Sequence, residues 1–141
     1  TGREGCRTPM PLYGAKTNAG FTTANEGWLP VPPEHARRAV TEQEKDPQSV
    51  LNFTQHYLKW RKSLPALITG SLKFEDAHKD LVAFSRTRGY ETVFCAFNFS
   101  RDAGTIPFKG TPVGGHGLEY TTQGETVTLP GFGGFFGKKA A

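Results

Sequence analysis

The sequence has few of the features that mark a membrane, nucleic-acid-binding or metal-binding protein. Its longest apolar stretches fall far short of the ~20 residues of a membrane-spanning helix. Its 17 basic and 13 acidic residues leave a net charge of only +4, without a dense basic run. Its four histidines, at positions 35, 56, 78 and 116, lack the spacing of metal ligands. We therefore expect no membrane, nucleic-acid or metal partner, and no cofactor.

Cysteine is also scarce, with only Cys6 and Cys95 in 141 residues. Cys95 lies in an apolar, strand-like run and is expected to be a small buried side chain. Two reduced thiols would favour a reducing compartment such as the cytoplasm, and a disulfide between them is the alternative. The chain begins without a methionine or a signal peptide, so we expect a fragment of a longer protein, whose targeting cannot be read from it.

A complete set of catalytic groups is missing as well. Hydrolysis of a glycosidic bond, for example, requires two placed carboxyl groups, whereas the acidic residues here lie on polar faces or at helix caps. No nucleophile elbow or Ser–His–Asp arrangement is present. The Gly-rich segment 110–117 lacks the Lys and the following helix of a phosphate-binding loop, so we expect a flexible connection there.

What the sequence does contain is an unusual opening segment, residues 2–11, which reads GREGCRTPMP. Pro9 and Pro11 fix φ and remove backbone donors, so this segment is expected to be a stiff, extended loop. It presents Arg3 and Arg7, whose planar guanidinium groups suit a carboxylate or a row of hydroxyls. The alternative from spacing alone is a surface loop whose arginines only face water.

Residues 13–45 are expected to be irregular, and a helix is expected over residues 46–64. Asp46 can cap that helix and Pro47 suits its first position. Apolar residues recur at three- and four-residue steps, which predicts one continuous face; they are Val50, Phe53, Tyr57, Trp60 and Leu64. This aromatic face could bind sugar, but its helical spacing favours packing against a large partner.

After Pro65 the pattern changes to that of strands. Apolar, alternating runs separated by turn residues are typical of an antiparallel β-sandwich. Strong runs occupy residues 71–75, 81–86 and 92–99, and weaker ones are expected at 106–109, 117–121, 125–129 and 134–136. The chain itself is thus predicted to hold a long loop, one long α-helix and an antiparallel β-sandwich.

The opening segment resembles a signature of α-glucosidases in the α-amylase superfamily, GR-[DE]-GCRTPMPW. The resemblance continues through NAGFT (18–22), WLPV (28–31), DPQSVLNF (46–53), WRK (60–62), PAL (65–67) and VFCAFNFS (93–100). The family usually has Trp where this chain has Leu12.

The resemblance implies a parent protein of the oligo-1,6-glucosidase and maltase type, with an α/β (β/α)₈ barrel and an all-β C-terminal domain. Residues 1–65 would be the last loop and helix of the barrel, and residues 66–141 the β-sandwich domain. The catalytic carboxylates would lie in the missing N-terminal barrel, so no catalytic residue is expected in this fragment, which should be inactive alone.

The resemblance also implies the reaction and the substrate. A retaining α-glucosidase hydrolyses α-glucosidic bonds at the non-reducing end of short α-linked gluco-oligosaccharides or α-glucosides. Arg7 would bind the terminal glucose, whereas Arg3 would brace the loop. The sequence leaves two alternatives open: a non-catalytic carbohydrate-binding or stabilising β-sandwich module, and a relative that serves as a scaffold for membrane transporters.

Overall fold

The structure, a computed structural model, describes residues 7–78 and 80–140 and divides into two compact units, residues 1–55 and 56–141. The predicted division of the parent protein into residues 1–65 and 66–141 stays a prediction. Among the described residues, no helix is both long enough and apolar enough to cross a membrane.

The first unit consists mainly of loops joined by short helical turns. These turns are η2 (Thr17–Gly20), α1 (Pro33–Ala36) and α2 (Val40–Gln43), and the unit ends within α3 (Val50–Lys62). Residues 13–45 are therefore largely irregular, as predicted. Proline explains much of this, because it supplies no N–H and fixes φ at positions 30, 32 and 33.

The long helix α3 begins at Val50, four residues after the predicted start at residue 46. Asp46 caps a turn instead, since its Oδ1 accepts the N–H of Gln48 at 2.9 Å. Ser49 takes the N-cap position, and its Oγ accepts the N–H of Asn52 at 3.1 Å. The sequence signals at Asp46 and Pro47 thus mark the turn before the helix. Helix α3 ends at Lys62, and Pro65 begins the next helix.

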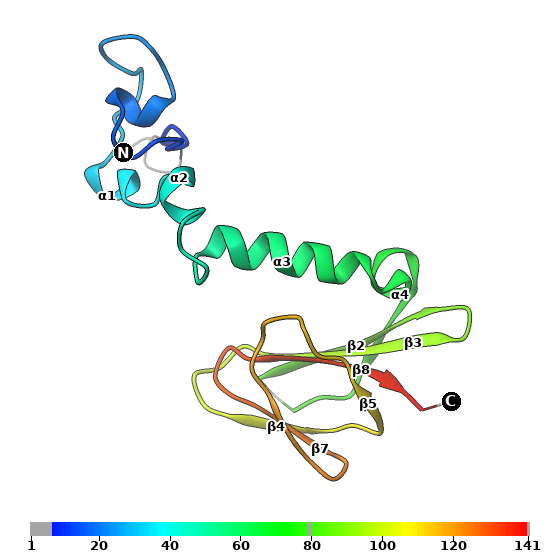
Figure 1. The fold of residues 1–141 in the computed structure, drawn as a ribbon. Helices are drawn as coiled ribbons and strands as arrows, with labels where there is room; N and C mark the ends of the chain where they lie inside the picture. The colour runs from blue at the N-terminus through cyan, green and yellow to red at the C-terminus, as the bar shows by residue number, and fades with distance from the viewer. Residues whose placement is uncertain (1–6, 79, 141) are drawn as a thin grey trace. The chain divides into compact units, whose positions relative to one another are not determined.

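The second unit contains the end of α3, helix α4 (Pro65–Thr69) and two antiparallel sheets (Figure 1). The larger sheet has the strand order β1-β2-β3-β8-β5 and the smaller one the order β4-β7-β6. The strands are β1 (Ser71–Glu75), β2 (Leu81–Arg88), β3 (Glu91–Asn98), β4 (Gly104–Pro107), β5 (Gly110–Pro112), β6 (Thr121–Gln123), β7 (Thr126–Leu129) and β8 (Gly134–Lys139). The predicted antiparallel sheets are confirmed.

Two corrections concern the weaker strands. The segment 110–117, expected to be a flexible connection, contains β5, which pairs with the end of β8. The strand expected at 117–121 begins only at Thr121. Short strands rich in Gly, Pro and Thr have no apolar alternation, so their pairing depends on neighbours distant in sequence.

Two hydrophobic clusters lie on opposite faces of the large sheet. The sandwich core fills the space toward the small sheet and includes Phe94, Phe135, Ile106 and Leu129. The helix-side core lies on the other face; its buried members are Leu64, Ala66, Leu67, Val93, Cys95 and Phe136, with Tyr57 and Trp60 packed against it. Strand β3 serves both cores, because its side chains alternate between the two faces.

The helix-side core also shows what the aromatic face of α3 contacts. The ring of Trp60 lies 4.8 Å from that of Phe136 and the ring of Tyr57 lies 6.2 Å from it, measured between centroids. Trp60 Nε1 donates to the carbonyl of Gly114 at 2.9 Å. The predicted face is therefore only partly packed: Tyr57 and Trp60 lie against the five-stranded sheet, whereas Val50 is 75% exposed. Cys95 is completely buried there, as predicted, and burial raises the pKa of its thiol to about 12.

Candidate functional site

The predicted arginine loop is described from Arg7 onward; Arg3, Glu4 and Cys6 lie outside the described residues. Residues 7–11 have no regular secondary structure. The carbonyl of Pro11 accepts the N–H of Val40 at 3.0 Å, and that of Leu12 accepts the N–H of Thr41 at 3.2 Å. The loop is thus tied to the start of α2, which gives it a fixed path without any helix or strand of its own.

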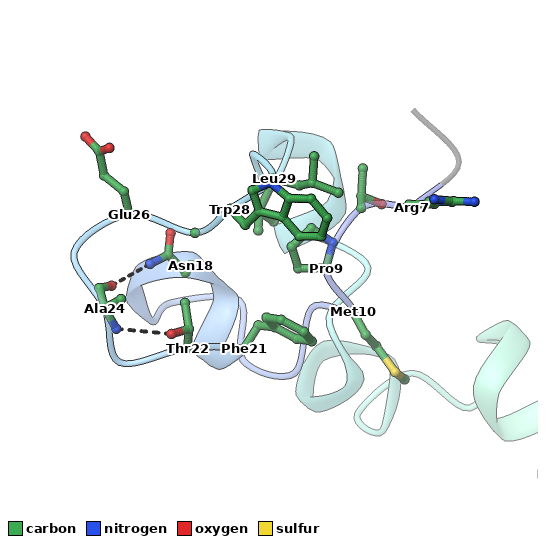
Figure 2. A pocket seen from close by; sticks show the side chains of 13 residues that line it. Arg7, Pro9, Met10, Asn18, Phe21, Thr22, Ala24, Glu26, Trp28 and Leu29 are labelled. Carbon is green, nitrogen blue, oxygen red and sulfur yellow. Dashed lines mark hydrogen bonds between the residues drawn. The ribbon is translucent and has the colours of Figure 1, made fainter. Parts of the chain in front are cut away.

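A cavity of about 600 Å³ opens beside this loop in the first unit (Figure 2). One wall is residues 7–10, and the other is formed by residues between Asn18 and Val31. Trp28 is 96% exposed and Phe21 is 57% exposed. Figure 2 shows Arg7 and Glu26 at opposite ends of the cavity, with the indole of Trp28 between them.

The second wall is shaped by unusual backbone conformations. Asn18 and Ala19 both have φ of 50°, and Gly20 has φ of 72°, so three consecutive residues are left-handed. Asn and Gly tolerate this region, whereas Ala does so at a cost in strain. Ala19 is buried, and its carbonyl accepts the N–H groups of both Leu12 and Tyr13 at 2.9 Å. Asn18 Nδ2 also donates to the carbonyl of Ala24 at 2.8 Å.

The described lining of the cavity has groups that suit a polar, hydroxyl-rich molecule. Arg7 offers a planar fork of donors, and Trp28 offers an exposed flat apolar surface. Among the described residues that line the cavity, Glu26 is the sole carboxylate, whereas glycoside hydrolysis uses two. Over residues 7–78 and 80–140, no group of His, Cys, Asp and Glu side chains could hold a metal ion.

The structure therefore places Arg7 on the rim of a cavity, but no contact of its guanidinium tests the predicted role. Sequence reasoning did not single out Trp28 or Phe21 as site residues. The available signal was a Trp in a Pro-rich loop, where a regular core position is impossible. Trp28 and Phe21 share a cavity with Arg7 only because of the path that residues 12–27 take in the fold.

His116, predicted to lie in a flexible connection, is instead buried in the second unit. Its ring lies 5.2 Å from that of Trp60 and 5.1 Å from that of Phe136. Nδ1 accepts the N–H of Leu118 at 3.1 Å, so the proton of the neutral ring is on Nε2, which has no hydrogen-bond partner among the described residues. Burial lowers the pKa of His116, and the neutral ring serves packing.

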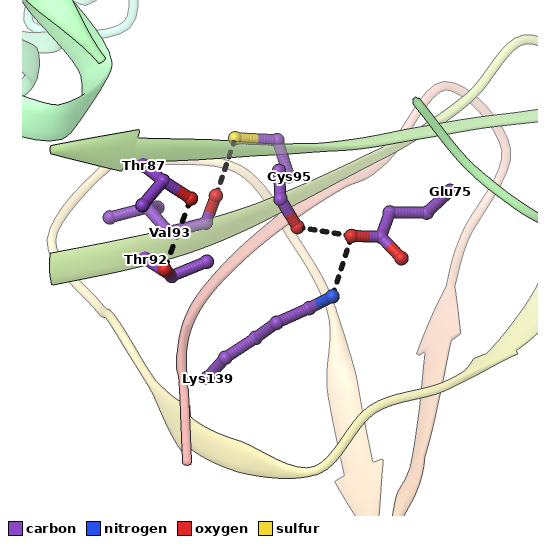
Figure 3. Close-up of polar contacts among 7 residues, drawn as sticks. Glu75, Thr87, Thr92, Val93, Cys95 and Lys139 are labelled. Carbon is purple, nitrogen blue, oxygen red and sulfur yellow. Dashed lines mark hydrogen bonds and ion pairs between the residues drawn. The ribbon is translucent and has the colours of Figure 1, made fainter. Parts of the chain in front are cut away.

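A second polar cluster joins three strands of the large sheet (Figure 3). Lys139 Nζ and Ser85 Oγ each donate to Glu75 Oε1 at 2.5 Å. These two hydrogen bonds, that from Lys139 first, hold the pKa of Glu75 below its usual value. Because Ser85 is buried and its proton points to a carboxylate already paired with Lys139, the cluster stabilises the sheet and is not a nucleophile with a free base.

Comparisons with known proteins show that the chain is similar to carbohydrate-active enzymes. The family model "Alpha amylase, catalytic domain" matches residues 1–70. The chain is 42% identical over 142 residues to a probable alpha-glucosidase of Rhizobium meliloti, covering 99% of this chain and 25% of that protein. It is 34% identical over 107 residues to the oligo-1,6-glucosidase IMA3 of Saccharomyces cerevisiae, covering 72% of this chain and 18% of the relative.

Solved structures of related enzymes are also similar to this chain in fold. The alpha-glucosyl transfer enzyme XgtA superposes with a TM-score of 0.87 at 33% identity, covering 99% of this chain and 26% of that one. The trehalulose synthase MutB from Pseudomonas mesoacidophila superposes with a TM-score of 0.79 at 25% identity, covering 98% of this chain and 26% of that one. The chain thus spans about a quarter of the length of these proteins.

Proposed function

Because this chain belongs to the alpha-amylase family, we propose that it is the C-terminal part of a retaining α-glucosidase that hydrolyses α-glucosidic bonds at the non-reducing end of short oligosaccharides. The observation that carries the proposal is the cavity of the arginine loop. It lies within the residues that match the catalytic-domain model, and its described lining combines binding groups with a single carboxylate. Such a site supplies groups that can bind a sugar, and the two catalytic carboxyl groups of a glycosidase would have to come from elsewhere in the parent protein.

The rest of the active site then belongs to the remaining three quarters of the parent protein. In this proposal residues 1–65 complete a (β/α)₈ barrel and residues 66–141 form its C-terminal β-domain. Barrel enzymes build their sites from loops at the C-terminal ends of the strands, and the loop of Arg7 would be one of them. The nucleophile and the acid/base would come from other loops of that barrel, so the 141-residue chain alone should show no turnover.

Arg7 has a defined part in this scheme. Its guanidinium would donate two hydrogen bonds to hydroxyls of the terminal glucose, which must stay fixed while the ring distorts toward the transition state. A covalent glucosyl–enzyme intermediate would follow, as retention requires. The substrate would be an α-linked gluco-oligosaccharide or α-glucoside. The free, buried thiol of Cys95 supports a reducing compartment such as the cytoplasm as the site of action.

The test is the variant Arg7→Ala in the full-length parent, with p-nitrophenyl α-glucoside as substrate. Hydrogen bonds from a charged donor contribute about 1.5–3 kcal/mol each, so kcat/KM should fall by roughly ten- to a thousandfold. Arg7→Lys should restore little, because an ammonium group lacks the planar fork. Arg37→Ala is the matched control, since Arg37 is also exposed in the first unit but does not line the cavity.

A thermal melt of each variant separates binding from folding. We expect Arg7→Ala to have the melting temperature of the wild type and a lower α-glucosidase activity. Wild-type kcat/KM in Arg7→Ala would remove Arg7 from the substrate site. A parent protein without α-glucosidase activity would contradict the proposed function as a whole.

A further inference from the structure

Two aromatic side chains are exposed at the end of the β-sandwich where β3 ends and β8 begins. Phe99 directly follows β3, Phe132 precedes β8, and each side chain is 68% exposed. Phe94 and Phe135 on the same two strands are instead buried in the sandwich core. Among the described residues, no other aromatic ring contacts Phe99 or Phe132. Packing of the core therefore does not account for these two rings.

One buried side chain, that of Asn98, fixes both loops that carry these rings. Asn98 is 4% exposed, and its Nδ2 donates to the carbonyls of Asp102 at 2.7 Å and Pro130 at 3.0 Å. Its Oδ1 accepts the N–H of Ser100 at 2.9 Å. The two loops are also joined directly, because Phe132 donates its N–H to the carbonyl of Ser100 at 3.1 Å. Both exposed rings are thus attached to a fixed backbone.

The backbone at Phe132 has an unfavourable conformation for so large a residue. Its φ is 59°, in the left-handed region that Gly adopts freely and Phe rarely adopts. The adjacent Gly131 and Gly133 have no space for a side chain, since a Cβ would meet the carbonyl of Arg101 or the ring of Pro130. A third Gly at position 132 would suit the turn better, so the exposed ring at this position suggests a function.

Two hollows of about 380 Å³ and 490 Å³ adjoin these loops. The first is lined by Asp80 and Asp102, the second by Tyr120 and Pro130, and Ala103 lines both. Among the described residues, the carboxylates of Asp80 and Asp102 have no hydrogen-bond or ion-pair partner. They are therefore available as hydrogen-bond acceptors for a ligand.

The combination of separate exposed rings and nearby carboxylates suits a sugar chain. A sugar ring has an apolar face of C–H groups, which can pack on an aromatic ring, and hydroxyls, which donate hydrogen bonds to carboxylates. Phe99 lies next to Asp80, whose carbonyl accepts its N–H at 3.0 Å. A protein partner would favour a continuous apolar patch instead. Over residues 7–78 and 80–140, no group of side chains could hold a metal ion.

We propose that this end of the sandwich is a second carbohydrate-binding site, which binds α-linked glucan chains. The rings of Phe99 and Phe132 pack against sugar units, and Asp80 and Asp102 accept hydrogen bonds from their hydroxyls. The inference rests on the proposed function only for the choice of α-linked glucose as the sugar. Because the site belongs to the second unit and the cavity of Arg7 to the first, the parent protein has two carbohydrate sites and holds polymeric glucan by both.

Native electrophoresis of the full-length parent through gels that contain amylopectin tests this proposal. The variants are Phe99→Ala and Phe132→Gly. Tyr90→Ala is the matched control, because Tyr90 is an exposed aromatic residue in the turn that precedes β3, at the opposite end of that strand from Phe99. The apparent Kd for amylopectin should rise roughly tenfold in each of the two Phe variants, as expected for the loss of one aromatic contact, and stay unchanged in Tyr90→Ala.

A second measurement and a second type of variant separate binding from folding. Gly suits the φ of position 132, so a thermal melt of Phe132→Gly should show no decrease in Tm even though glucan binding is lost. Asp80→Asn keeps the shape of the side chain and removes its charge, and it should raise the apparent Kd roughly fivefold.

Several outcomes would overturn the proposal. One is a wild-type parent that amylopectin does not retard, and another is equal retardation of the wild type, Phe99→Ala and Phe132→Gly. A loss as large in Tyr90→Ala would show that any exposed ring on the sandwich has the same effect. A glucan-free dimer that dissociates in Phe132→Gly, detected by sedimentation velocity, would assign the rings to an interface between two copies.

An assay of the wild-type parent with p-nitrophenyl α-glucoside separates this inference from the proposed function. An active parent that amylopectin does not retard would overturn the second site alone. An inactive parent whose retardation depends on Phe99 and Phe132 would overturn the proposed activity and still support the second site.

Discussion

The two units of this chain differ in the interactions that stabilise each of them. In the first unit, the buried residues among those described are only Ala19, Ala39 and Ser49. Its turns are fixed by hydrogen bonds, such as those from Asn52 Nδ2 to the carbonyls of Gln43 at 3.0 Å and Asp46 at 2.8 Å. The second unit instead has a hydrophobic core on each side of its large sheet.

This difference separates the candidate binding site from the source of stability. The cavity of Arg7 and Trp28 belongs to the unit with little buried apolar area, whereas the aromatic clusters belong to the unit without that cavity. Hydrophobic burial is the dominant favourable contribution to folding, so the free energy of unfolding of the chain should reside mostly in residues 56–140.

The largest effect is expected from Phe136→Ala. Phe136 is buried and contacts the rings of Tyr57, Trp60, Phe97 and His116, so its removal leaves a cavity under α3. The free energy of unfolding should fall by about 3–5 kcal/mol, measured by urea denaturation followed by circular dichroism.

Phe21→Ala is the matched control for this prediction, because Phe21 is an exposed ring of the first unit. It should change the same quantity by no more than about 0.5 kcal/mol. A comparable loss in the free energy of unfolding in both variants would contradict the conclusion that stability resides mostly in the second unit.

Limited trypsinolysis of the 141-residue chain should show an intermediate effect. Sites in the first unit, such as Lys16 and Arg38, should be cut roughly tenfold faster than Arg86 in β2, because cleavage requires local opening. Mass spectrometry of the early products gives the order of cutting. Equal protection of both groups would mean that the first unit is as stable as the second.

The smallest effect concerns the pH dependence given by Glu75. Its pKa is lowered in the folded state, so the stabilisation is complete above the usual value of 4.5 and is lost as the pH falls through the folded pKa. Lys139→Met should reduce stability at pH 7 by up to about 1 kcal/mol, since the pair is partly solvated. The difference from the wild type should shrink toward pH 3 in urea melts.

Lys109→Met is the control for this measurement. Its partner Glu125 lies 3.8 Å away, and both side chains are largely exposed, so this pair should contribute little at any pH. Identical pH profiles for wild type and Lys139→Met would show that the stability of the second unit does not depend on the Glu75–Lys139 pair.

The sequence predicted those elements whose pattern is local. The apolar, strand-like runs at residues 81–86 and 92–99 predicted β2 and β3, and Cys95 was correctly expected to be buried. Strand β5 was missed because Gly110–Pro112 owes its structure to pairing with β8, far away in sequence. The start of α3 was misplaced because Asp46 and Pro47 also suit a turn, and Ser49 is an equally good cap.

The candidate site was predicted less completely. Arg7 could be named because the motif around it resembles a family signature. Trp28 could not, since an exposed indole becomes a site residue only when the left-handed turn at 18–20 brings its loop beside residues 7–10. His116 was misjudged for a related reason. The Gly-rich sequence around it predicts a flexible connection, whereas the rings of Trp60 and Phe136 pack against it in the fold.

The double role of β3 has a practical consequence for anyone who wishes to isolate the β-domain. Val93 and Cys95 on this strand require Leu64 and Leu67 as a cover, and Tyr57 and Trp60 pack beside them. An expression boundary after α3 would keep Leu64 and Leu67 but remove Tyr57 and Trp60, which would expose Phe136 and favour aggregation. A soluble fragment must therefore start within α3, near residue 56, and carry the last turns of the helix with the sandwich.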